Sequence, residues 1–175
     1  MPHTIRTTNL LMRPPSLRDA RAYAHHFNDW DVVAQTGTWT YPIDHRYAAF
    51  RLRQAFKFRP FEDHVFVLEK GGQFAGVCGI HHDRGRDYSV GYMLPRAVWG
   101  QGIATEALRA VCDFGFRACK ARVIWGEAYV ANPASRRVLQ KVGMRFVREE
   151  MGWSAARAAS FPMRRYEMTR TEFRP

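Results

Sequence analysis

Two closely spaced glycines at the start of a helical pattern, Gly100 and Gly102, constrain the fold of this 175-residue chain more than any other feature. They stand in Trp99-Gly100-Gln101-Gly102-Ile103-Ala104, between a strand pattern and a helical pattern. Glycine lets the backbone bend tightly and present bare N–H groups. The helix that follows adds unpaired first-turn N–H groups and the positive end of its dipole, so the segment predicts a phosphate-binding site. Thr105 can add a hydroxyl. A glycine-rich turn that begins a helix without binding any ligand explains the pattern equally well.

The rest of the chain alternates between strand and helix patterns, which predicts an α/β fold. Strands are expected over residues 4–12, 64–70, 73–81, 87–94, 122–130, 144–151 and 163–171. Helices are expected over residues 16–27, 45–57, about 103–119 and 132–143, with connections at residues 31–40 and 152–162. The turns at Gly71-Gly72 and around Gly85 are too short for parallel crossovers, so the central strands should be antiparallel.

Composition favours a folded domain, because 46% of the residues are hydrophobic and 14% are aromatic. No apolar run reaches the roughly 18 residues that cross a bilayer, and the N-terminus has no signal-peptide pattern. We therefore expect a cytoplasmic protein with no membrane partner. Three cysteines without a CxxC pair argue against a disulfide framework and against a metal site.

The net charge of +11 is compatible with nucleic acid, an anionic membrane or an acidic ligand. Arginine greatly outnumbers lysine, and the arginines are spread along the whole chain without forming a basic arm. An arginine-rich composition explains the charge at least as well as a nucleic-acid partner, so we do not expect nucleic acid to bind.

A rival interpretation of the glycine pair is a dinucleotide site, since Gly100-x-Gly102-x-x-Thr105 is one residue short of the GxGxxG fingerprint. That fingerprint normally follows a strand directly within a parallel βαβ unit. Here Pro95 to Trp99 intervene and the preceding strands look antiparallel, which disfavours the dinucleotide site.

A second strand-to-helix junction carries polar groups at Asn132-Pro133-Ala134-Ser135. Asn132 suits the N-cap and Pro133 the first helical position, while Gly143 suits the end of that helix. Capping explains Asn132 but does not explain Ser135.

Taken together, these motifs resemble the GNAT acetyltransferases, and most closely their RimJ/RimL-like branch. The matching segments, in chain order, are Gly91-Tyr92-Met93-Leu94, Trp99-Gly100-Gln101-Gly102-Ile103-Ala104-Thr105-Glu106-Ala107, Asn132-Pro133-Ala134-Ser135 and Gly143-Met144. The resemblance covers nearly the whole chain and implies one domain over residues 1–175. It implies a mixed, mostly antiparallel central sheet, splayed between strands 87–94 and 122–130 and flanked by about four helices.

The resemblance also implies acetyl-CoA as co-substrate and an amine as acceptor, with no metal. Pantetheine would lie in the gap of the splayed sheet, and pyrophosphate would lie on the amides from Gly100 to Thr105. The cofactor-binding residues that it implies are Met93, Leu94, Trp99, Gly100, Gln101, Gly102, Ile103, Ala104, Thr105, Asn132 and Ser135.

The family's usual tyrosine, the general acid for the departing thiolate, corresponds to Leu139 here. Ser135 resembles the branch's serine near the thioester sulfur, and we expect it to take that role. Glu127 is the expected base; His81, His82, Asp87 and ordered water stay open as alternatives. No cysteine neighbours these motifs, which disfavours a covalent acetyl-cysteine.

Acceptor specificity should come from residues 36–41 and from the connection at residues 152–162. Trp39 and Tyr41 could wall an acceptor pocket or be ordinary core aromatics. The acceptor amine is either a protein N-terminus or a small molecule, and a homodimer is left open. A catalytically inactive CoA-binding protein and a basic RNA- or ribosome-binding module remain as alternative functions.

Overall fold

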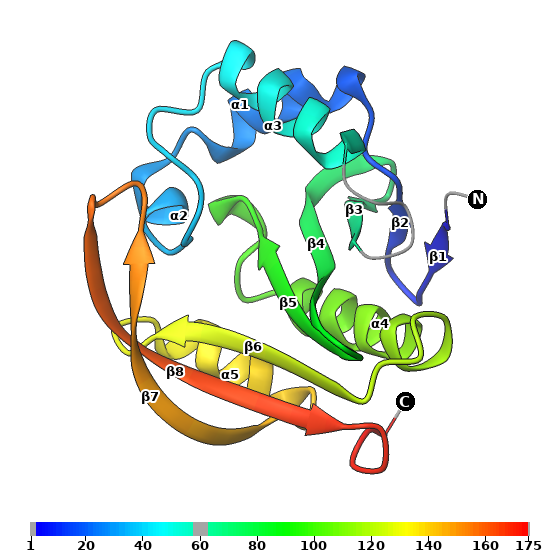
Figure 1. The fold of residues 1–175 in the computed structure, drawn as a ribbon. Helices are drawn as coiled ribbons and strands as arrows, with labels where there is room; N and C mark the ends of the chain where they lie inside the picture. The colour runs from blue at the N-terminus through cyan, green and yellow to red at the C-terminus, as the bar shows by residue number, and fades with distance from the viewer. Residues whose placement is uncertain (1–2, 58–62, 175) are drawn as a thin grey trace.

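Eight strands form one open sheet in the computed structural model, which describes residues 3–57 and 63–174 (Figure 1). The strands are β1 (Ile5–Arg6), β2 (Leu11–Arg13), β3 (Asp63–Lys70), β4 (Gln73–Arg84), β5 (Asp87–Met93), β6 (Val123–Tyr129), β7 (Arg145–Ser154) and β8 (Ala159–Thr169). Their order across the sheet is β1-β2-β3-β4-β5-β6-β8-β7. Among the strands of the described residues only β5 and β6 are parallel neighbours, so the predicted mixed, mostly antiparallel sheet is confirmed.

Helices cover both faces of the sheet. They are α1 (Ala20–Phe27), α2 (Trp30–Val33), α3 (His45–Lys57), α4 (Ile103–Arg117) and α5 (Pro133–Lys141), with 3-10 turns η1 (Leu17–Asp19) and η2 (Arg96–Val98). On β3, Phe66 packs with Leu108 of α4, whereas its neighbour Val67 packs with Tyr23 of α1 and Leu52 of α3. Successive strand residues point to opposite faces, so the sheet around β3 is buried between two helical layers.

The N-terminal segment differs from the single strand predicted over residues 4–12, which is wrong. It forms a hairpin of two short strands, in which Ile5 pairs with Met12 and Arg6 with Leu11. The Thr7 N–H donates to the Leu10 carbonyl at 3.0 Å and closes the turn. Thr and Asn side chains favour such turns because they bond nearby groups, and this preference outweighs the β-branched pattern.

Capping side chains set the starts of the helices on the first layer. Ser16 and Asp19 form the predicted capping box, although the first turn is the 3-10 turn η1. Asp44 accepts from the Tyr47 N–H at 2.7 Å, as expected for the start of α3. The predicted connection at residues 31–40 is partly helical, because Asp29 accepts from the Asp31 N–H at 3.0 Å and begins α2.

The sheet opens between β5 and β6. These strands pair only over residues 87–89 and 123–125. Beyond that point β5 stays paired with β4 to Met93, and β6 stays paired with β8 to Tyr129. The two halves therefore diverge, as Figure 1 shows, and the expected splay is confirmed.

The predicted connection at residues 152–162 is wrong, because most of it continues the β7–β8 hairpin. Gly152 pairs with Phe161, and Ser154 pairs with Ala159 next to the turn. The Ala155 N–H donates to the Gly37 carbonyl at 3.0 Å, so the tip of the hairpin rests on the segment after α2. Small side chains do not prevent a strand when the partner strand supplies the hydrogen bonds.

In the described ranges, 3–57 and 63–174, every helix is too short or too polar to cross a bilayer.

Candidate active site

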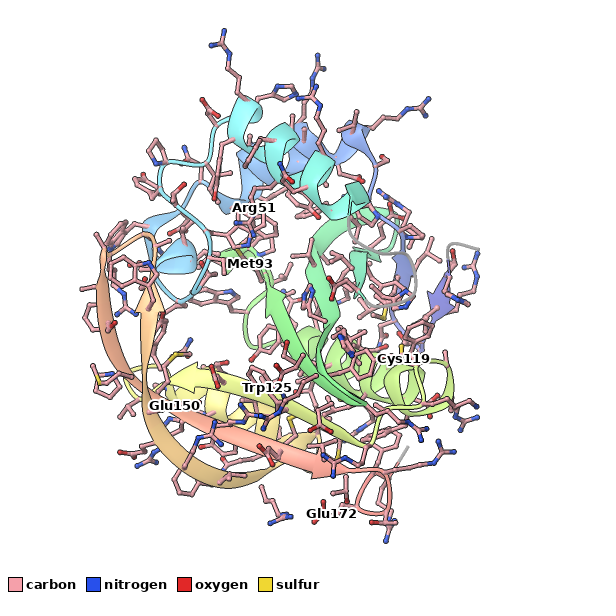
Figure 2. All side chains as sticks on the ribbon, in the orientation of Figure 1. Arg51, Met93, Cys119, Trp125, Glu150 and Glu172 are labelled. Carbon is pink, nitrogen blue, oxygen red and sulfur yellow. The ribbon has the colours of Figure 1, made fainter. Side chains whose placement is uncertain are left out.

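A cavity of about 500 Å³ opens where β5 and β6 separate. Its walls come from α2 and the segment after it, the end of β5, the loop before α4, the first turn of α4, and α5. The lining residues are Asp31, Val32, Gln35, Thr36, Tyr92, Met93, Leu94, Val98, Trp99, Gly100, Gly102, Ile103, Ala104, Thr105, Ala131, Asn132, Ala134, Ser135, Arg137, Val138 and Lys141. The cavity therefore joins the two strand-to-helix junctions that the sequence singled out. Figure 2 labels Met93 at the end of β5.

The loop before α4 is built to receive an anion. Gly100 and Gly102 have φ angles of +75° and +79°, and open space lies where a side chain would project from either. Within the described residues, no backbone N–H from Gly100 to Thr105 has a hydrogen-bond partner, and Gly102 at the N-cap supplies no side-chain cap. Unpaired N–H groups and the positive helix end favour phosphate at this position.

Side chains around this loop hold its shape. The Trp99 indole N–H donates to the Leu94 carbonyl at 2.9 Å, so Trp99 fastens the loop to the end of β5. The Gln101 amide donates to the Ala97 carbonyl at 3.1 Å, and the Lys70 ammonium donates to Gln101 at 3.0 Å. Gln101 is thus the one predicted cofactor residue that does not line the cavity, because its side chain bonds the β3–β4 hairpin.

An arginine connects the loop to α2. Arg96 donates from Nε and Nη2 to the two carboxylate oxygens of Asp29 at 3.0 and 2.9 Å, and it also bonds Asp31. Because α2 forms one wall of the cavity, this bidentate ion pair fixes that wall relative to the loop.

The start of α5 contributes two polar groups. Asn132 Oδ1 accepts from the Ser135 N–H at 3.0 Å, which is the predicted cap. The Ser135 hydroxyl lies 2.8 Å from the hydroxyl of Tyr92 on β5. Burial raises the pKa of Tyr92 to about 12, so its phenol keeps its proton at neutral pH.

Glu127 lies on β6 but does not line this cavity. A side chain at the preceding Gly126 would meet Leu139 of α5, so Glu127 points to the face of the sheet opposite α5. Its carboxylate lies 3.9 Å from Arg165 Nη1. Burial, and next the Glu150 carboxyl on β7, raise the pKa of Glu127 to about 7 despite Arg165. Figure 2 labels Glu150 and Trp125 near the divergent strands.

The alternative bases have local partners. His81 Nδ1 lies 3.5 Å from the Asp63 carboxylate. A ring nitrogen of His82 lies 3.1 Å from the Gly85 carbonyl, and Asp87 forms an ion pair with Arg122 at 2.9 Å. None of the three lines the cavity, and neither does Glu127, so the choice of base stays a prediction.

The two predicted acceptor aromatics also lie outside the cavity lining. Trp39 packs against the core beneath α1 and α3, with the Arg51 guanidinium 4.3 Å from its ring. Tyr41 is exposed and meets Trp30 edge to face at 5.6 Å. A role for either in acceptor binding stays a prediction.

Sequence reasoning assigned no role to several residues that the structure brings to the site. Tyr92 stands inside the Gly-Tyr motif, but its contact with Ser135 crosses from strand to helix. Arg137 and Lys141 line the cavity from α5, and their i, i+4 spacing could have indicated a shared face. Glu150 lies beside Glu127 only because β7 returns next to β8.

The cysteines lie apart from this chemistry. Cys78 and Cys112 are fully buried and Cys119 is partly buried. Burial raises the pKa of Cys78 to about 12 and that of Cys119 to about 11. Within residues 3–57 and 63–174, no three His, Cys, Asp or Glu side chains gather as a metal site would require.

A sequence profile of the family described as acetyltransferase (GNAT) domain matches residues 9–145. The uncharacterized protein YkkB of Bacillus subtilis is 35% identical over 89 residues, which cover 49% of this chain and 52% of that protein. The chain therefore matches about half the length of that relative. The uncharacterized N-acetyltransferase p20 of Bacillus licheniformis is 25% identical over 146 residues, covering 79% of this chain and 80% of p20.

Among solved structures, Mycobacterium smegmatis RimJ in complex with CoA-disulfide has a TM-score of 0.84 and 23% identity. The match covers 98% of this chain and 88% of RimJ, so the two share the fold along nearly their whole length.

Proposed function

Because this chain belongs to the GNAT family of acetyltransferases, we propose that it transfers an acetyl group from acetyl-CoA to a primary amine. The acceptor is either a protein N-terminus or a small amine, and it attacks directly in a ternary complex. Residues 1–175 act as one domain. The single observation that carries this proposal is the cavity that joins the end of β5 and the start of α5 to the unpaired amides of α4.

The cavity suits the chemistry of acetyl-CoA. The amides from Gly100 to Thr105 would bind pyrophosphate, and the divergent edges of β5 and β6 would hold the pantetheine arm near Met93, Leu94 and Asn132. Arg137 and Lys141 add two cationic side chains to the lining, which suits a ligand with several phosphates. A volume of about 500 Å³ lies within the range of small-molecule sites.

The proposed reaction needs a neutral amine, because an ammonium has no free electron pair. Glu127 takes the proton from the amine, and its raised pKa of about 7 suits a base that works near neutral pH. The amine nitrogen then attacks the thioester carbonyl carbon. The C–N bond forms, the C–S bond breaks, and its electron pair goes to sulfur; the proton that the nitrogen loses on becoming an amide passes through solvent to the departing thiolate. Ser135, which lines the cavity, donates a hydrogen bond to that sulfur.

Thermal unfolding with and without acetyl-CoA tests the binding part of this proposal. Acetyl-CoA at about 100 times its dissociation constant should stabilise the protein by roughly 2.7 kcal/mol. A Gly102→Glu variant, which puts a carboxylate where phosphate would lie, should lose this stabilisation. Gly85→Glu is the matched control, since Gly85 also has a positive φ with open space around it but lies in the β4–β5 turn. No shift for the unmodified protein at millimolar acetyl-CoA would overturn the proposal.

Turnover with a panel of amines tests the catalytic part. Free CoA thiol is measured with N-terminal peptides in one series and small amines in another. Faster release with one series identifies the acceptor class. Binding of acetyl-CoA without turnover for any amine would instead favour a non-catalytic CoA-binding protein.

A further inference from the structure

The hydroxyl pair formed by Tyr92 and Ser135 links the end of β5 to the first turn of α5. The two oxygens lie 2.8 Å apart, and both residues line the cavity. They come from the two sides of the opening in the sheet, since β5 lies on one side and α5 follows β6 on the other.

Either hydroxyl could donate this hydrogen bond, and the surrounding groups favour Tyr92 as the donor. Within residues 3–57 and 63–174, the Tyr92 hydroxyl has two acceptors in reach, the Ser135 hydroxyl at 2.8 Å and the Ser135 carbonyl at 3.5 Å. The shorter contact has the better geometry, so the Tyr92 proton belongs on Ser135 Oγ. Phenols are also more acidic than aliphatic alcohols, which makes tyrosine the better donor.

This direction leaves the Ser135 hydrogen without a protein acceptor. In the described part of the chain, Ser135 Oγ makes no hydrogen bond other than the one with Tyr92. Ser135 lies in the first turn of α5, where its own N–H is already used by the Asn132 cap. Its hydroxyl hydrogen is therefore available to a group in the cavity.

We propose that Tyr92 is a positioning residue, which donates to Ser135 and thereby directs the Ser135 hydrogen toward the sulfur of the departing thiolate. This inference rests on the proposed acetyl transfer. The amine proton leaves through the base, the electron pair of the C–S bond goes to sulfur, and neither hydroxyl gives up its proton. The pair supplies the stabilisation of the leaving group that Leu139 cannot provide. A bond donated by a polarised hydroxyl is stronger than one from an isolated serine.

The ionisation of bound CoA tests this arrangement directly, because free CoA resembles the product after the C–S bond has broken. The ultraviolet absorbance of the thiolate is followed against pH in the complex with CoA. Tyr92→Phe should raise the pKa of the bound thiol by about one unit, which is a tenfold change in thiolate stability. Ser135→Ala should raise it at least as far, and the double variant should equal Ser135→Ala, because Tyr92 acts through Ser135.

Single-turnover kinetics give a second measurement. Tyr92→Phe should lower the rate of acetyl transfer by roughly tenfold and leave the affinity for acetyl-CoA within about twofold. Tyr166→Phe is the matched control, because Tyr166 is a fully buried tyrosine on β8 that does not line the cavity. It should change neither the thiol pKa nor the rate.

The outcomes separate this inference from the proposed function. Normal turnover with an unchanged thiol pKa and rate in Tyr92→Phe would overturn the role of Tyr92 and leave the acetyltransferase proposal standing. Additive effects in the double variant would also overturn it. Failure of the unmodified protein to bind acetyl-CoA or to acetylate any amine would overturn the proposed function itself.

Discussion

Glu106 accepts two hydrogen bonds from Asn9, one from its backbone N–H at 2.7 Å and one from its side-chain amide at 2.9 Å. Thr7 donates a third at 2.6 Å. One carboxylate in the first turn of α4 thus holds the β1–β2 turn, which lies about a hundred positions earlier in the chain. The same helix end carries the unpaired amides of the phosphate site, so Glu106 connects the N-terminal hairpin to that site.

We predict that Glu106→Ala lowers the free energy of unfolding by about 1–2 kcal/mol, because charge-assisted hydrogen bonds are lost from a partly exposed site. Acetyl-CoA binding should weaken severalfold, since the first turn of α4 loses a fixed support. Urea unfolding and calorimetric titration measure the two effects. Glu149→Ala, which removes an exposed carboxylate from β7, is the control and should change neither quantity.

A second prediction concerns the pH dependence of turnover. The carboxyl of Glu127 must be ionised to accept a proton, so kcat/KM should rise with pH through a midpoint near 7. The groups that face it are Glu150 and Arg148 on β7 and Arg165 and Glu167 on β8. Glu127→Gln should remove this rise and lower turnover by roughly 100-fold. A smaller rise that remains in Glu127→Gln would belong to the acceptor amine. A profile unchanged from that of the unmodified protein would exclude Glu127 as the base.

The same carboxyl predicts how stability varies with pH. Its pKa is about 7 in the folded protein and 4.5 as a reference for the unfolded chain, so the native state binds more protons between these values. The contribution of Glu127 to stability is therefore present below pH 4.5 and is lost as pH rises through 7. Melting temperatures of the unmodified protein and of Glu127→Gln should agree near pH 4. The variant should be the more stable of the two at pH 8.

Local signals were enough to predict much of this fold. Two helix starts are predicted from neighbouring residues, one from Ser16 with Asp19 and one from Asn132 with Pro133. In the structure Ser16 and Asp19 form a capping box, and Asn132 accepts from the Ser135 N–H. The Gly100–Gly102 spacing predicts a tight turn before α4, and both glycines have positive φ. These features depend on the backbone preferences of neighbouring residues, which a single sequence records.

The features that the sequence did not predict involve residues whose bonding partners are distant in the chain. Residues 7–10 turn rather than continue a strand, and Glu106 bonds that turn from α4. The pairing of Gly152 with Phe161 depends on a hairpin register that no local pattern records. The contacts of Tyr92 with Ser135 and of Glu150 with Glu127 arise only after the strand order is set.

The cysteine thiols supply a fourth prediction. Only a thiolate attacks a disulfide reagent at a useful rate, and burial holds the pKa of Cys78 and Cys112 far above neutral. An aromatic disulfide should therefore label Cys119 slowly in the native protein, and Cys78 and Cys112 only after unfolding. Cys119→Ser should retain full turnover. Rapid labelling of a second thiol in the native state, blocked by acetyl-CoA, would reopen a covalent acetyl-cysteine.

The contact between Gly76 on β4 and the end of β5 gives the last prediction. Gly76 has a φ of +135°, and a side-chain carbon there would lie 2.6 Å from the Met93 carbonyl oxygen and 2.4 Å from Leu94 Cδ2. Gly76→Ala must therefore strain the backbone or push residues 93–94 toward the cavity that they line. We expect unfolding to become easier by about 1–3 kcal/mol, the usual effect of overpacking, with weaker acetyl-CoA binding.

Gly91→Ala on β5 is the matched control for this variant, because Gly91 has nothing within 4 Å of the added carbon and no positive φ. It should change stability by less than about 0.5 kcal/mol and leave binding unchanged. Equal effects of the two substitutions on acetyl-CoA binding would mean that the close approach of Gly76 does not set the cavity wall. A selective loss in Gly76→Ala would show that β4 determines where the end of β5 lies.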